Sequence, residues 1–126
     1  MAFIQYEITE YRVVLTSYQT GSTIGTSTIV AAIECQEPNA NRCLVYFIAD
    51  DEPLPPNMYN AEEKAFACYH HGKRFPWFVD ILRNEKPVKC RIFTDYLQSS
   101  GIECGFEPVG DGEKKQLIWR YGIIPI

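Results

Sequence analysis

The chain has 126 residues, of which 46% are hydrophobic and 22% charged, and its formal net charge is −4 at pH 7. This length predicts one domain over residues 1–126, large enough to bury a core without disulfide staples. No run of about 18 apolar residues occurs, which excludes a membrane-spanning helix and a membrane partner. A net acidic chain is repelled by phosphate backbones at long range, which disfavours general coating of nucleic acid.

The N-terminus and the cysteines both favour a cytoplasmic protein. The first residues, MAFIQYEITEY, have neither the basic start nor the apolar segment of a secretory signal peptide. The five cysteines are odd in number and widely spaced, without the C-x-x-C spacing of a zinc site or redox pair. We therefore expect free thiols, mostly in the core, with no metal and no cofactor. They are Cys35, Cys43, Cys68, Cys90 and Cys104.

Most of the chain predicts strands. The first strand alternates, with Tyr11, Val13 and Leu15 on one face. The run CLVYFIA is nearly all apolar, which indicates a central strand buried on both faces. Turn residues separate the strand-like runs. The strands are expected over residues 3–18, 22–35, 43–49, 64–71, 88–94, 100–109 and 115–126.

Two segments interrupt the strands. Residues 50–63, DDEPLPPNMYNAEE, predict a long irregular connection because its three prolines cannot donate to a ladder. Pro76 at a first helical position predicts a short helix over residues 76–85. We expect the apolar stripe Trp77, Phe78, Ile81 and Leu82 to face the core. We expect Asp80, Arg83 and Asn84 to face water.

Many strands with one short helix predict a mainly β fold, of the β-rich α+β kind. Because strands do not alternate with long helices, a doubly wound parallel sheet is disfavoured. The expected architecture is a small antiparallel barrel or strongly bent sheet of about six or seven strands, with the helix packed on one end. A two-layer α+β sheet is the alternative.

The basic residues gather in one stretch. Residues 64–91 carry seven of the twelve Lys and Arg residues and only two acids, whereas the segments on either side are acidic. Together with nearby aromatic residues, this composition resembles the cationic grooves that bind single-stranded nucleic acid. The alternatives are an ordinary solvated face, or pairing with the protein's own acids in the 50–63 connection. The predicted binding residues are His71, Lys73, Arg74, Arg83, Lys86, Lys89 and Arg91.

One pair of residues suggests catalysis. Cys68 and His70 share a face of the predicted 64–71 strand, and such a pair could act as a nucleophile and its base. His71 points to the other face, so adjacent histidines do not form one metal site. Because no orienting carboxylate or third ligand occurs at a recognisable spacing, the structural interpretation of His70 is favoured.

The C-terminus is strongly apolar. Residues 117–126, LIWRYGIIPI, end the chain where fraying is the usual outcome. Either this segment docks into its own core, or it forms a homodimer through an edge strand. Docking within the chain is the favoured alternative.

Three classes of function follow from these patterns. A small non-catalytic interaction module, binding a protein partner or itself, ranks first because the chain carries no recognisable catalytic motif. Single-stranded nucleic-acid or anion binding along the basic stretch ranks second. A small enzyme using Cys68 and His70 ranks third.

Overall fold

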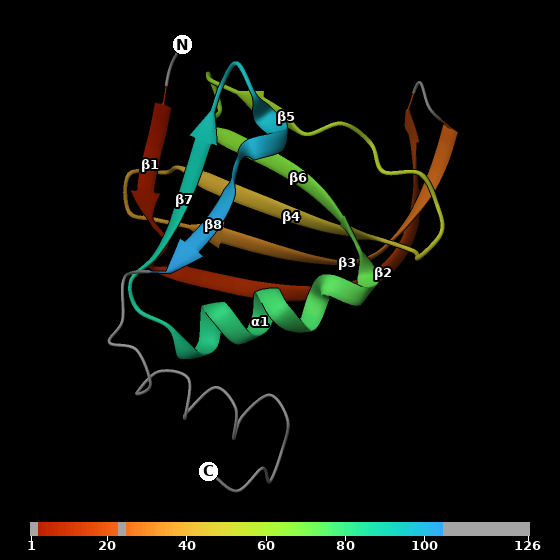
Figure 1. Cartoon of the computed structure of the whole chain (residues 1–126), viewed down its shortest axis with the longest axis horizontal. Helices are drawn as coiled ribbons and strands as arrows, with labels where there is room; N and C mark the ends of the chain where they lie inside the picture. Colours follow the sequence, from red (N-terminus) through yellow and green to blue (C-terminus); the bar gives the residue numbers. More distant parts are fainter. Residues whose placement is uncertain (1–2, 23–24, 105–126) are drawn as a thin grey trace, which may run out of the picture.

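The computed structural model describes residues 3–22 and 25–104, which form eight strands, one α-helix and two short 3-10 helices (Figure 1). The helices are η1 (Gly72–Arg74), α1 (Phe75–Asn84) and η2 (Leu97–Ser99). The strands are β1 (Phe3–Glu7), β2 (Glu10–Ser22), β3 (Gly25–Gln36), β4 (Arg42–Ile48), β5 (Met58–Asn60), β6 (Ala65–His71), β7 (Val88–Phe93) and β8 (Gly101–Cys104).

The strands form two sheets rather than a closed barrel. The large sheet has the order β2-β3-β4-β6-β5, and the small sheet has the order β1-β7-β8. Figure 1 shows the small sheet and α1 lying over one face of the large sheet, while the β2–β3 hairpin bends strongly at its far end. The mainly β, β-rich α+β prediction is therefore confirmed, including one short helix at the expected position.

The large sheet is mixed, which corrects the expectation of an all-antiparallel arrangement. Strand β4 pairs with β6 in parallel, with Arg42 opposite Ala65 and Ile48 opposite His71. The reason is the long connection after β4, which carries the chain back along the sheet before β6 begins. The side chain of Asn57 holds this connection in position. It accepts a hydrogen bond from the Tyr69 amide and donates one to the Leu97 carbonyl in η2.

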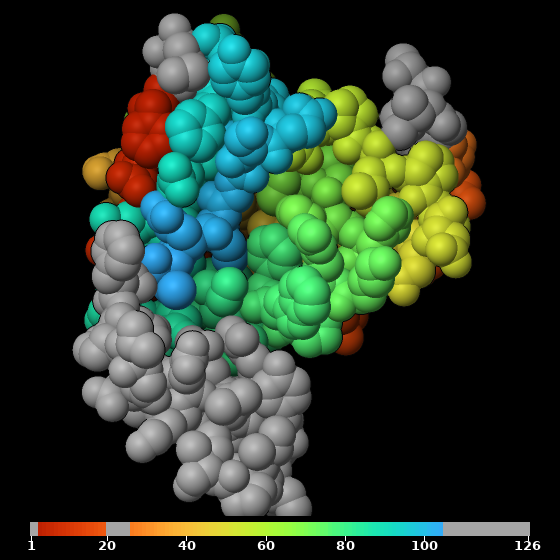
Figure 2. All heavy atoms as spheres, in the orientation of Figure 1, coloured from red at the N-terminus to blue at the C-terminus, as the bar shows by residue number. Residues whose placement is uncertain are grey.

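The core lies between the two layers. The inward side chains of β4, namely Cys43, Val45 and Phe47, are fully buried. They meet the inward residues of β3, β6 and β7 in one apolar cluster. Strand β7 alternates as its sequence predicts, with Val88, Cys90 and Ile92 buried. Figure 2 shows the covering layer from outside, with β7 and β8 in cyan and blue beside α1 in green.

The helix packs through most of the expected stripe, since Phe78, Ile81 and Leu82 contact the core cluster and only Trp77 does not. Phe75, Phe78, Val79 and Leu82, at positions i, i+3, i+4 and i+7, pack against the core cluster together with Ile81. The Phe47 ring contacts those of Phe75 and Phe78, with centroid distances of 5.1 and 5.4 Å. Because the helix begins at Phe75, this phenylalanine joins the stripe, while Trp77, about 200° away around the helix, lies outside it.

Two exposure predictions for the helix are therefore wrong. Trp77 is 64% exposed, and Asp80 is only 4% exposed instead of facing water. The Asp80 carboxylate accepts a hydrogen bond of 2.8 Å from the Asn84 side chain one turn later. This amide partner compensates part of the cost of removing the carboxylate from water.

The packing predicts unequal effects of two aromatic truncations. Phe47→Ala should lower the free energy of unfolding by about 3–5 kcal/mol, because it leaves a cavity beneath the helix. Trp77→Ala should lower it by less than about 1 kcal/mol, because the indole is mostly exposed. Urea denaturation of both variants measures the two values, and equal losses would contradict this packing.

Candidate functional site

The predicted basic residues do not gather on one surface. His71, Lys73 and Arg74 lie at the end of β6 and in η1, before the helix. Arg83 and Lys86 lie in the last turn of α1 and just after it. Lys89 and Arg91 lie on the outward face of β7. The ten-residue helix separates the first group from the second by about 15 Å.

The group before the helix fixes the long connection. A ring nitrogen of His71 lies 2.8 Å from the carbonyl oxygen of Glu52. The backbone amide of Lys73 donates to the Asp50 carboxylate. The Glu52 carboxylate in turn accepts a hydrogen bond of 2.6 Å from the Thr28 amide. His71, Asp50 and Glu52 therefore have structural partners within the fold, and the connection is anchored at its N-terminal end.

The group on β7 is paired with its own neighbours. Arg91 donates to Glu103 on β8 at 3.2 Å, and its guanidinium lies 5.3 Å from the centre of the Phe93 ring. Lys89 stands opposite Glu7 on β1 and Glu103 on β8. Acids from adjacent strands thus offset the positive charge of this face, which weakens its attraction for an anionic ligand.

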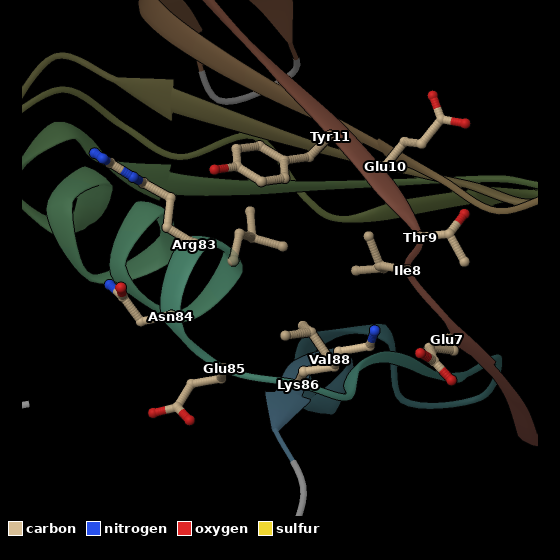
Figure 3. Close-up of a pocket in the computed structure, with 11 residues that line it drawn as sticks. Glu7, Ile8, Thr9, Glu10, Tyr11, Arg83, Asn84, Glu85, Lys86 and Val88 are labelled. Atoms are coloured by element: carbon tan, nitrogen blue, oxygen red, sulfur yellow. The ribbon is translucent and has the colours of Figure 1, made fainter. Parts of the chain in front are cut away.

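The second group, Arg83 and Lys86, lines a pocket. Arg83 and Lys86 form part of the wall of a cavity of about 400 Å³, together with the acids Glu7, Glu10 and Glu85 (Figure 3). This wall carries both signs of charge. A wall with both signs of charge does not select an anion. Its basic and acidic side chains offer hydrogen-bond donors and acceptors, which a peptide backbone can use.

The same pocket has an apolar interior beside the start of β2. Figure 3 shows Ile8 and Tyr11 projecting toward the helix, with Val88 next to Ile8, whose amide donates to the Val88 carbonyl at 2.8 Å. Leu82 of α1 completes the apolar lining. The pocket therefore lies between the connection from β1 to β2 and the C-terminal end of α1.

Strand β2 forms one edge of the large sheet. In the described part of the chain it pairs with β3 alone, although it extends over 13 residues. Val13, Leu15 and Tyr18 are 41%, 76% and 47% exposed. Sequence reasoning noted the alternation of Val13 and Leu15 but did not identify this surface. Alternation gives the face of a strand and not its place at the edge or centre of a sheet.

The outer face of the large sheet adds aromatic surface next to this edge. The rings of Tyr46 on β4 and Tyr69 on β6 stack at 5.4 Å. Burial raises the pKa of both phenols, and the nearby Tyr18 of β2 raises them further. A tyrosine surface that reaches the edge strand suits protein contacts, in which tyrosine combines apolar area with a polar tip.

Four thiols meet in the core. Cys43 shares hydrogen bonds with Cys35, Cys68 and Cys90, and these contacts and burial raise its pKa well above the usual value. Contact with Cys43 and with His70 lowers the pKa of Cys68 to about 6, although burial opposes this shift. None of the five cysteines forms a disulfide.

The Cys68–His70 pair lacks access to a substrate. Cys68 is only 1% exposed, and His70 packs on the Phe78 ring at a centroid distance of 4.8 Å. A lowered pKa increases the thiolate fraction, but a buried thiolate reacts only when the fold opens around it. This arrangement fits thiols that fill the core better than a nucleophile and its base.

Other site types and the comparisons add no candidate. Within residues 3–22 and 25–104, no group of three or more His, Cys, Asp and Glu side chains has the geometry to hold a metal ion. In the same residues, no helix has both the length and the apolar character needed to cross a membrane. The apolar segment 117–126 lies outside the described residues.

No protein-family model, curated protein sequence or solved structure matches the chain.

Burial of Cys68 predicts slow alkylation. In the native protein, iodoacetamide should modify Cys68 at least about a hundredfold more slowly than it modifies an unfolded peptide thiol, because reaction requires local opening. Peptide mass mapping gives the rate for each cysteine, and the urea-unfolded protein is the control. Labelling of Cys68 as fast as the free thiol would restore the catalytic hypothesis.

Proposed function

We propose that this protein is a non-catalytic interaction module whose protein partner adds a strand along β2. The observation that carries the proposal is the long edge strand with exposed apolar side chains. An edge strand presents unpaired backbone donors and acceptors, and partner strands bind to such edges by extending the sheet.

The two edges of the large sheet differ in their protection. Proteins guard free edges with charges, prolines, bulges or short strands. The β5 edge is three residues long, and the proline-rich connection runs before it. In β2, the segment from Val13 to Gln19 contains no charged residue and no proline. A bulge follows Leu15 within this segment, and Leu15 is the most exposed of the apolar side chains of β2.

The usable part of the edge is the regular half of β2. The register with β3 shifts between Leu15 and Tyr18, which indicates a bulge. A bulge bends its strand and interrupts pairing. Before it, Glu10–Leu15 pair one-to-one with β3, over the length of an average strand. A partner strand is therefore expected along Glu10–Leu15, next to the pocket.

The other two classes of function have less support. The predicted nucleic-acid surface would need its seven basic residues to act together, but the ten-residue helix separates His71, Lys73 and Arg74 from the others. Arg91 also has an acidic partner. The proposed enzyme would need access to Cys68, which is 1% exposed. A surface alone is sufficient for an interaction module.

A charge on the edge should remove partner binding. Tagged wild-type protein should retain a partner from a lysate of its native cells, and Leu15→Lys should weaken this retention by about tenfold or more, because the lysine opposes strand addition. Because position 15 is solvent-exposed, replacing leucine by lysine there should change the free energy of unfolding by less than about 1 kcal/mol.

The matched control is Met58→Lys. Met58 is 60% exposed and lies on β5, at the opposite edge of the same sheet. This variant should retain the partner as the wild type does. Identical protein sets on all three proteins would overturn the proposal, since no retained protein would then depend on β2.

The sequence predicts that residues 117–126 either dock within their own chain or form a homodimer through an edge strand. Deleting them separates the two alternatives of the sequence analysis. If the segment docks within its own chain, the deletion lowers the free energy of unfolding and leaves the mass by light scattering unchanged. If the segment forms a homodimer, the deletion halves the mass of the assembly. We expect the first outcome, since docking within the chain avoids the cost of association.

A further inference from the structure

We infer that the strand added to β2 is β2 of a second copy of this chain, paired antiparallel about Val13. The inference rests on the proposed function, because it names the partner for the same edge. It joins the two large sheets into one continuous sheet across a twofold axis.

Symmetry limits the registers that are available. When a twofold axis runs perpendicular to a sheet, residues that stand opposite each other must point to the same face. The axis therefore lies midway between the two copies of one residue. With the axis at Val13, this residue faces its own copy, and Tyr11 faces Leu15 of the second copy on the inner face. Arg12 faces Val14 of the second copy on the outer face.

Neighbouring registers are less favourable. An axis at Arg12 would set two arginines directly opposite each other, and like charges in this arrangement are destabilising. An axis at Tyr11 would leave Leu15 beyond the start of β2 in the second copy. An axis at Val14 would set Tyr11 opposite Ser17, inside the bulge. Among these registers, Val13 covers both exposed inner-face residues within the regular half of the strand.

The pocket supports the Val13 register. Tyr11 lines the pocket together with Ile8 and Leu82. Directly opposed side chains in an antiparallel pair have Cβ atoms about 4.5–5.5 Å apart. Leu15 of the second copy would thus lie against Tyr11, beside the apolar lining. The most exposed apolar side chain of the strand would then be covered by the other copy, at two symmetric places.

Charge does not oppose this contact. The Glu10–Leu15 edge carries two charged residues of opposite sign, Glu10 and Arg12. Arg12 already pairs with Glu34 of β3, at 3.0 Å. The edge is thus nearly neutral even though the whole chain carries −4. Antiparallel pairing of two identical edges also uses up both of them, so the assembly closes as a dimer rather than growing into a fibre.

Crosslinking at the axis tests the inference. In Val13→Cys, the two introduced thiols of a dimer face each other, and a short bis-maleimide should join the copies at least about tenfold faster than it joins Met58→Cys. The wild type gives the background from the native cysteines. Light scattering of the wild type should give twice 14.5 kDa, and Leu15→Lys should weaken the dimer by about tenfold or more.

The overturning result differs from that for the proposed function. A wild-type mass of 14.5 kDa at high protein concentration, with Val13→Cys crosslinking no faster than Met58→Cys, overturns the second copy as partner. If the tagged protein still retains a different protein in a Leu15-dependent manner, the interaction module stands and this inference alone fails. If Leu15→Lys changes neither the retained proteins nor the mass of the assembly, both fail.

Discussion

The structure depends on the burial of the inner face of β4 beneath the covering layer, which consists of β1, β7, β8 and α1. Its inward side chains Cys43, Val45 and Phe47 have no exposed surface, and they contact β3 and β6 on either side and the covering layer above. Since successive side chains of a strand alternate between faces, a slip of one residue would place Leu44 and Tyr46 in the core. This register fixes the positions of all the other strands of the large sheet. It also sets the position of α1, whose Phe75 and Phe78 rest on Phe47.

The covering layer is narrower than the sheet beneath it. Three short strands and a ten-residue helix lie over the central strands, and β2 lies at the margin. On the same inner face, exposure therefore rises outward along one row of paired residues. Phe47 of β4 is 0% exposed, Ala31 of β3 is 5%, and Leu15 of β2 is 76%. The exposed edge follows from this geometry, because Leu15 belongs to the same apolar row as the core.

Local patterns in the sequence predicted the elements but not their order. Alternation placed Val88, Cys90 and Ile92 inward, and Pro76 located the helix to within one residue. The parallel pairing of β4 with β6 and the marginal position of β2 depend on contacts between distant segments, which periodicity does not contain. Trp77 was misplaced for a local reason. The helix begins one residue earlier than Pro76 suggests, and Phe75 joins the buried stripe.

The candidate sites likewise show that the composition of a segment does not predict which residues meet in the fold. The basic stretch looks like one surface in the sequence, but its neutralising partners come from elsewhere, such as Glu103 of β8 for Arg91. Conversely, the widely spaced cysteines show no motif, yet four of them meet because each occupies an inward position on its own strand. Their convergence follows from a core that favours small apolar side chains between closely packed sheets. A function for this chain is therefore better sought where the fold leaves apolar surface uncovered, along β2, than where the sequence concentrates charge or sulfur.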